Sequence, residues 1–128
     1  MQTIEEALAK LQTSKFRSSF TLKEKDKAYV REKGMDTIRR HAQDFVRQRL
    51  APAVIPNDGR QTPMHGHPVF LAQHACACYC RGCLNKWYRV PKGMELSARQ
   101  QEKIVNLLMA WIARQMQEDG KPRPPAAG

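Results

Sequence analysis

The chain has 128 residues, which suits one domain with a single hydrophobic core and is too short for two independent cores. Hydrophobic residues make up 41% of the sequence and charged residues 27%, a balance typical of a folded domain with a water-facing surface. The 22 Lys and Arg residues outnumber the 12 Asp and Glu residues, and the net charge of +10 favours an acidic partner such as nucleic acid, a phosphorylated ligand or an acidic protein surface.

Three helices are predicted in the N-terminal part of the chain. Residues 3–11 repeat apolar side chains at helical spacing after a threonine and two glutamates, and a second pattern over residues 26–33 ends at Gly34. The third pattern, residues 36–50, has one apolar stripe and is closed by Pro52. Four arginines lie largely off that stripe and form a predicted basic helix face: Arg39, Arg40, Arg47 and Arg49.

A proline- and glycine-rich stretch, residues 51–68, follows and predicts an irregular loop. The last helix is predicted to begin with a capping box at Ser97–Gln100 and to carry a wide apolar face as far as Met116. Its apolar stretch, residues 104–113, is too short to span a membrane. The final residues, 120–128, have nothing able to bury area and are expected to be a disordered proline-rich tail.

The cysteines are expected to be reduced. The N-terminal residues have acids where a secretory signal has positive charge, so we expect a cytoplasmic protein. Disulfides are rare in that compartment, and a cysteine cluster there is more often metal-binding or reactive.

Residues 65–83 contain three of the four histidines and all four cysteines. The spacing of Cys80 and Cys83 lets two thiolates reach one ion, and a tetrahedral zinc site needs two further N or S ligands. His67 and His74 would lie about 10 Å apart on a continuous helix, so both can serve only if His67 sits in the loop before Pro68. The sequence therefore predicts a structural zinc ion held by His67, His74, Cys80 and Cys83.

Several alternatives to this ligand set stay open. His65, Cys76 or Cys78 can replace one of the four, and Cys76 and Cys78 can equally pack in the core as small apolar residues. A redox dithiol at Cys80 and Cys83 is a further alternative, although no βαβ pattern surrounds it. The zinc deaminase signature is absent because no glutamate follows His74 at the required spacing.

The same segment resembles a known family. The motifs that carry the resemblance are Gly66-His67-Pro68, Gln73-His74-Ala75, Cys80-Arg81-Gly82-Cys83-Leu84, Lys86-Trp87 and Pro91-Lys92-Gly93. They are similar to a bacterial and mobile-element domain of unknown function, over roughly residues 14–115. The resemblance implies a shared fold and no established activity. It also implies counterparts for the four predicted zinc ligands, threonine-like residues at Cys76 and Cys78, and a cysteine at Tyr79.

Basic and aromatic residues alternate directly after the C-x-x-C motif. Arg81, Lys86, Arg89 and Lys92 are interleaved with Trp87 and Tyr88, a composition typical of surfaces that neutralise phosphates and stack on bases. The alternative is that the two aromatic rings close the core and the cations are ordinary solvated side chains.

The sequence thus predicts a mainly α-helical single domain over residues 1–119, with an inserted zinc knuckle and an irregular loop. Four protein ligands would leave the zinc ion no open position for substrate, which argues against a metalloenzyme. The expected function is a non-enzymatic, nucleic-acid-associated binding module. The alternatives are an adaptor or inhibitor that binds an acidic protein surface, and a small zinc- or cysteine-dependent enzyme.

Overall fold

The computed structural model describes residues 3–117, which form seven α-helices, one π-helical segment and no strand, so the mainly α fold class is confirmed. In chain order they are α1 (Ile4–Gln12), α2 (Lys15–Ser18), α3 (Glu24–Lys33), α4 (Met35–Phe45), the π-helical segment η1 (Val46–Leu50), α5 (Pro68–Ala75), α6 (Arg81–Tyr88) and α7 (Ala98–Gln117). The predicted tail, residues 120–128, lies outside the described range. Within that range, no helix has the length and apolar character needed to cross a membrane.

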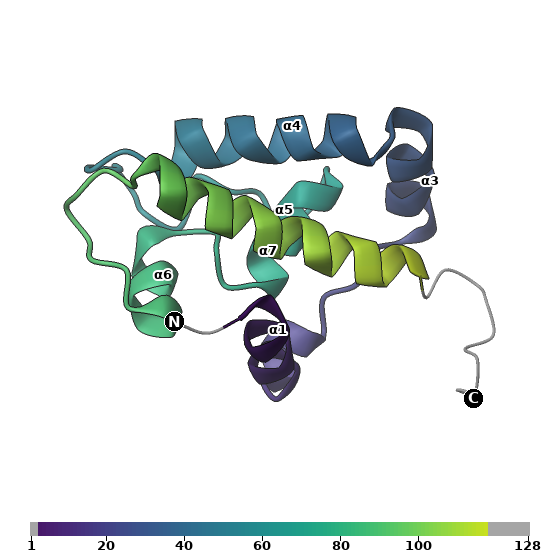
Figure 1. The fold of residues 1–128 in the computed structure, drawn as a ribbon, viewed down its shortest axis with the longest axis horizontal. Helices are drawn as coiled ribbons and strands as arrows, with labels where there is room; N and C mark the ends of the chain where they lie inside the picture. The colour runs from purple at the N-terminus through teal and green to yellow at the C-terminus, as the bar shows by residue number, and fades with distance from the viewer. Residues whose placement is uncertain (1–2, 118–128) are drawn as a thin grey trace.

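The longest helix, α7, organises the fold. It begins at the predicted capping box, in which the Gln100 amide donates to Ser97 Oγ over 3.1 Å and the Ser97 amide donates to Gln100 Oε1 over 2.8 Å. It packs against α1, α4, η1 and α5. In Figure 1, α4 lies along one side of α7 and α1 along the other. Because α7 contacts other elements on several sides, a wide apolar face of this helix is buried.

The chain between α3 and α5 combines one sharp turn, a helix that ends in a π-helical turn, and one long loop. Gly34 takes a φ of 88°, a conformation that favours glycine, and it ends α3 and begins α4. The predicted helix over residues 36–50 is present, but its last turn is π-helical. Residues 51–67 form the predicted irregular loop, and Pro68 occupies the first turn of α5 as expected.

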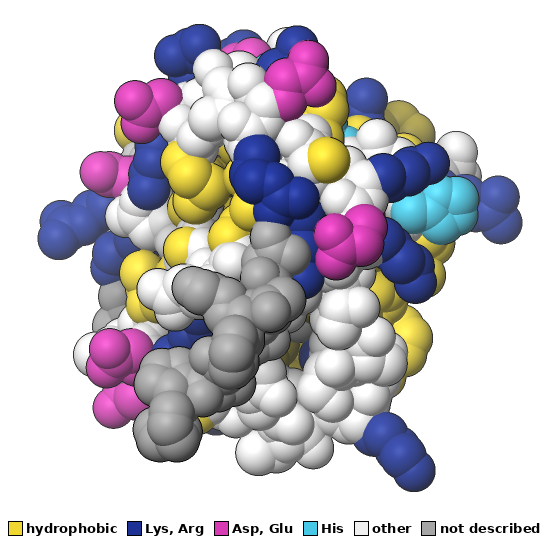
Figure 2. All heavy atoms as spheres, turned by 90° about the vertical axis from the view of Figure 1, so that its right-hand side faces the viewer, with side chains coloured by type: hydrophobic (Ala, Val, Ile, Leu, Met, Phe, Trp, Pro, Cys, Tyr) yellow, Lys and Arg dark blue, Asp and Glu magenta, His cyan; other side chains and the backbone are white. Residues whose placement is uncertain are grey.

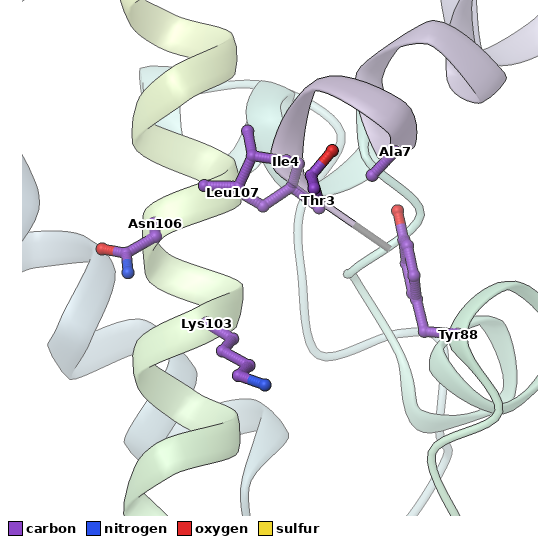
Figure 3. A pocket seen from close by; sticks show the side chains of 7 residues that line it. All are labelled: Thr3, Ile4, Ala7, Tyr88, Lys103, Asn106 and Leu107. Carbon is purple, nitrogen blue, oxygen red and sulfur yellow. The ribbon is translucent and has the colours of Figure 1, made fainter. Parts of the chain in front are cut away.

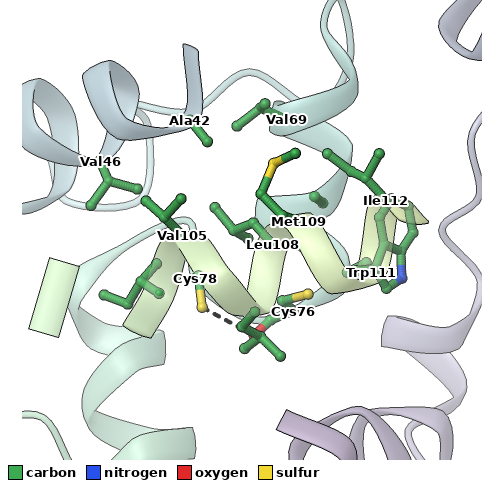
Figure 4. Packing of buried hydrophobic residues seen from close by; sticks show 14 of the residues in the cluster. Ala42, Val46, Val69, Cys76, Cys78, Val105, Leu108, Met109, Trp111 and Ile112 are labelled. Carbon is green, nitrogen blue, oxygen red and sulfur yellow. Dashed lines mark hydrogen bonds between the residues drawn. The ribbon is translucent and has the colours of Figure 1, made fainter. Parts of the chain in front are cut away.

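Two of the four cysteines belong to the core. Cys76 and Cys78 are fully buried and pack with residues of α4, α5 and α7 (Figure 4). The Cys78 thiol donates to the Cys76 carbonyl across a tight turn in which Ala77 takes a left-handed φ of 58°. Burial raises the pKa of Cys76 well above its usual value and that of Cys78 to about 12. Both therefore behave as small apolar residues, the alternative that the sequence left open.

Candidate functional site

The C-x-x-C motif forms the start of α6, a helix that the sequence analysis did not predict. Cys80 is the N-cap, and its Sγ accepts a hydrogen bond from the Cys83 amide over 3.3 Å. The Asp58 carboxylate, from the irregular loop, accepts from the amides of Arg81 at 2.9 Å and Gly82 at 3.0 Å. The first amides of the helix are therefore satisfied by one thiol and one carboxylate, which fixes both cysteines in place.

The two thiols of the motif have different surroundings. Cys80 is only 7% exposed, and burial is the main cause that raises its pKa to about 11. The Asp58 carboxylate also raises this pKa, because it lies near the Cys80 sulfur. Cys83 is partly exposed, and its amide donates to Cys80 Sγ. The pair thus has one buried and one partly exposed residue.

Arg17, from the four-residue helix α2, places a positive charge beside Cys83. Its guanidinium donates to the His74 carbonyl over 2.7 Å and to Cys83 Sγ over 3.6 Å, and the side chain is 8% exposed. The same group lies over the rings of Phe16, Tyr79 and Trp87, at 4.9, 5.3 and 6.0 Å from their centroids. Arg17 was not predictable from the sequence, because a single turn of helix 57 residues before His74 carries no pattern that points to this contact.

His74 lies next to this group but is occupied by other contacts. Its ring stacks between Phe20 and Tyr79, with centroids at 5.8 and 4.3 Å. Its Nε2 lies 3.2 Å from the Thr62 carbonyl oxygen and 3.1 Å from that of Pro63. Because carbonyls only accept hydrogen bonds, Nε2 carries the hydrogen, and burial lowers the pKa of the ring.

His67 lies at the opposite end of α5, paired with a second histidine. The Val69 amide donates to His67 Nδ1 over 3.0 Å, so neutral His67 carries its hydrogen on Nε2, which donates to His41 Nδ1 over 3.0 Å. Three aromatic rings surround the pair: Tyr29, Phe45 and Phe70. Burial, followed by the neighbouring His41, lowers the pKa of His67 to about 4. Both ring nitrogens of His67 are therefore used within the fold.

This arrangement predicts a loss of stability in mild acid. The unfolded chain binds a proton at His67 below the ordinary pKa of 6.5, whereas the folded chain resists it down to about 4. The contribution is complete above about pH 6.5 and is lost as the pH falls toward 4, by roughly 1–2 kcal/mol after screening of this partly exposed group. Urea unfolding at about pH 7 and pH 5 measures this loss. His67→Asn keeps a capping oxygen but has no titrating ring. Its loss should be smaller, and an equal loss in both proteins would contradict the assignment.

The four predicted zinc ligands are not brought together. Cys80 and Cys83 are adjacent and His74 stacks on the neighbouring Tyr79, but His67 is held by His41. Within residues 3–117, no three His, Cys, Asp or Glu side chains are grouped so that they could hold one metal ion. The alternative ligands do not complete a site either, because His65 is exposed in the loop and Cys76 and Cys78 are buried in the core. Zinc stays a prediction of the sequence.

The four residues predicted to bind nucleic acid divide into two groups. Arg81 is only 4% exposed, and its guanidinium donates to five backbone carbonyls, so it is not part of the exposed basic surface in this structure. Those carbonyls belong to Leu50, Ala51, Pro52, Pro91 and Met94. Lys86, Arg89 and Lys92 are exposed and form what we call the α6 surface. Arg81 thus anchors the helix that carries Lys86 and is followed directly by Arg89.

The aromatic residues of the same segment are engaged with the protein. Trp87 is partly buried against the core, and the Lys10 ammonium lies 5.7 Å from its ring centroid. The Tyr88 hydroxyl donates to the Cys76 carbonyl. Tyr88 also borders a cavity of about 280 Å³ between α1, α6 and α7 (Figure 3), whose lining is mostly apolar. The residues that line it include no His, Cys, Asp or Glu, which is no arrangement for acid–base catalysis.

Arginines of the second predicted basic face, on α4 and η1, contact other side chains of the protein. Arg39 donates to Asn106 over 2.9 Å, Arg47 pairs with Asp44 at 3.0 Å, and Arg49 lies over two aromatic rings. Figure 2 views the α3 end of the molecule, where Lys and Arg side chains alternate with Asp and Glu. Neither region presents the uninterrupted positive charge that a phosphate backbone favours.

No solved structure matches the chain. A family model described as a domain of unknown function (DUF4186) matches residues 5–113, in agreement with the resemblance found in the sequence. The chain belongs to the DUF4186 family, a domain of unknown function.

Proposed function

We propose that the protein binds the phosphate backbone of nucleic acid through the α6 surface. The observation that carries the proposal is the exposure of Lys86, Arg89 and Lys92 on one short helix and the loop that follows it. Asp58 is a nearby negative charge. Its carboxylate accepts hydrogen bonds from two amides of α6, which offset part of the carboxylate's charge. A net charge of +10 over the whole chain adds a long-range attraction to polyanions.

The binding mode should be insensitive to base sequence. Phosphate contacts position a protein on nucleic acid, whereas base contacts specify the sequence. Trp87 and Tyr88, the candidate stacking residues, already pack against this protein's own groups. We therefore propose a non-enzymatic module that recognises the negative charge of the phosphate backbone. A cytoplasmic location is part of the same proposal.

Zinc is not needed for this mode. For the four predicted ligands to share an ion, His67 would have to leave His41 and Val69, and His74 would have to release two carbonyls. The residues present do not fit the site in this arrangement. Helix α6 is instead anchored by Arg81 and capped by Asp58.

A salt titration with two matched triple variants tests the proposal. Lys86→Gln/Arg89→Asn/Lys92→Gln removes the α6 surface, and asparagine suits the left-handed backbone of Arg89, whose φ is 60°. Lys25→Gln/Arg40→Gln/Arg47→Gln removes equal charge from α3, α4 and η1. Binding to a labelled mixed-sequence duplex of DNA or RNA is measured from about 50 to 200 mM salt. Each lost phosphate contact should reduce the slope of log K against log salt by about 0.9 on duplex DNA.

The α6 variant should bind at least about tenfold more weakly at low salt, with a slope smaller by about 2 to 3, while the control loses less than about threefold. Equal losses in the two variants would remove the assignment to α6. Absence of binding by the unaltered protein at about 50 mM salt would remove the nucleic-acid function itself and favour an acidic protein partner.

A further inference from the structure

The two cysteines at the start of α6 have the geometry of a pair able to form a disulfide. They are three residues apart at a helix N-terminus, and Cys80 Sγ accepts a hydrogen bond from the Cys83 amide over 3.3 Å. A disulfide requires Cα atoms within about 7 Å and converging side chains, which this turn supplies. The Cys80 side chain therefore already points toward Cys83.

The two cysteines have neighbours of opposite charge. The Arg17 guanidinium lies 3.6 Å from Cys83 Sγ, whereas the Asp58 carboxylate lies on the side of Cys80. A positive neighbour attracts the anionic group of an approaching disulfide, and a negative one repels it. Cys83 is also the partly exposed member, so it is the one that an external molecule can reach. These differences make Cys83 the attacking thiol and Cys80 the thiol that completes the reaction.

We propose that Cys80 and Cys83 form a thiol–disulfide exchange site for small anionic disulfides such as glutathione disulfide. The Cys83 thiolate attacks one sulfur of the substrate, forming a mixed disulfide and expelling one thiolate. The Cys80 thiolate then attacks Cys83 Sγ, which forms the Cys80–Cys83 disulfide and expels the second thiolate. The two protons that leave the cysteines end on the two released thiols. The protein loses two electrons, and the substrate disulfide gains them.

The preference for an anionic substrate follows from the same helix. Arg17 lies at the attacked sulfur, and Lys86, Arg89 and Lys92 add exposed positive charge on α6 and the loop that follows it. A carboxylate-bearing disulfide is attracted to this region, whereas a diamine disulfide such as cystamine is repelled. The exchange reaction does not depend on whether nucleic acid binds.

The remaining cysteines supply an internal control. Cys76 and Cys78 are fully buried, and reaction at either sulfur requires the core to open. In the folded protein only the α6 pair should react. In urea all four thiols should react at similar rates.

The experiment exposes the purified reduced protein to glutathione disulfide and follows intact mass and peptide maps. The expected product lacks two hydrogens and links Cys80 to Cys83. Cys80→Ser should stop at one glutathione bound to Cys83, Cys83→Ser should leave Cys80 unreacted on the same timescale, and the control Cys78→Ala should react as the parent does. Cystamine should react at least about threefold more slowly at low salt, with the difference shrinking as salt is added.

Four results would overturn the proposal. They are a mixed disulfide on Cys80 in the Cys83→Ser variant at the parent rate, reaction of Cys76 or Cys78 before the α6 pair, equal rates for both substrates at low salt, and reaction of the pair only after treatment with a chelator. The last result would mean that the two thiols are held by a metal ion and not free to exchange.

Discussion

Replacing Arg81 by leucine should lower the free energy of unfolding by about 4 kcal/mol. The guanidinium donates to carbonyls at the end of η1 and in the loop after α6, with the shortest contacts at 2.6 Å to Met94 and 2.8 Å to Pro52 and Pro91. Leucine fills much of the volume but leaves these buried acceptors without a donor, each at a cost of about 1–3 kcal/mol. Equilibrium urea unfolding followed by circular dichroism measures the change.

Two further variants make that prediction specific. Arg60→Leu removes an exposed arginine and should change the unfolding free energy by no more than about 0.5 kcal/mol. Arg81→Lys keeps the charge but lacks the planar fork that reaches carbonyls on two segments, so an intermediate loss is expected. A loss below about 1 kcal/mol for Arg81→Leu would show that these contacts do not anchor α6.

Replacing Arg17 by methionine should cost about 2–3 kcal/mol, the second largest effect that we expect. The substitution removes the charged hydrogen bond to the His74 carbonyl and the cation–π contacts with Phe16, Tyr79 and Trp87. The carbonyl keeps a second donor, the Ala77 amide at 3.3 Å, which limits the loss. Guanidinium unfolding of the purified variant measures it.

The matched control for Arg17 lies two residues away. Lys15 is on the same short helix and is exposed, so Lys15→Met removes an equal charge without breaking a buried contact. It should change stability by about 0.5 kcal/mol or less. Equal losses for Lys15→Met and Arg17→Met would indicate that net charge, and not the buried contacts, is responsible.

The elements with strong local signals were predictable from sequence. The capping box at Ser97 begins α7, the helical spacing of apolar residues gives α1, and Pro68 begins α5. Each of these signals acts within one or two turns of the chain. The irregular loop was predictable for the same reason, because proline and glycine restrict or free the backbone where they stand.

Helix α6 escaped prediction because its start depends on groups outside it. Gly82 argues against a helix interior, but at the second position of the helix its amide is held by Asp58, 24 residues earlier in the chain. Cys80 serves as the cap, a role usually filled by serine, threonine, asparagine or aspartate. No local pattern announces either interaction.

The candidate site was only partly predictable. The C-x-x-C spacing predicted that Cys80 and Cys83 lie close together, and they do, because this spacing is a local feature of the chain. The pairing of His67 with His41 joins residues 26 apart, and the burial of Arg81 depends on five carbonyls from two distant segments. Arg17 reaches Cys83 across 66 residues. Contacts of this kind are set by tertiary packing, which residue types and spacing do not encode locally.

The central claim is that α6, anchored by Arg81 and capped by Asp58, presents its cations to a phosphate backbone. The most direct measurement is a nuclear magnetic resonance titration of the isotope-labelled protein with a mixed-sequence duplex, following the backbone amides. The account predicts that the largest shift changes fall at residues 85–93, reverse with added salt, and are small over residues 24–45. If the largest changes instead map to α3 and α4, or if none occurs at low salt, the claim is contradicted.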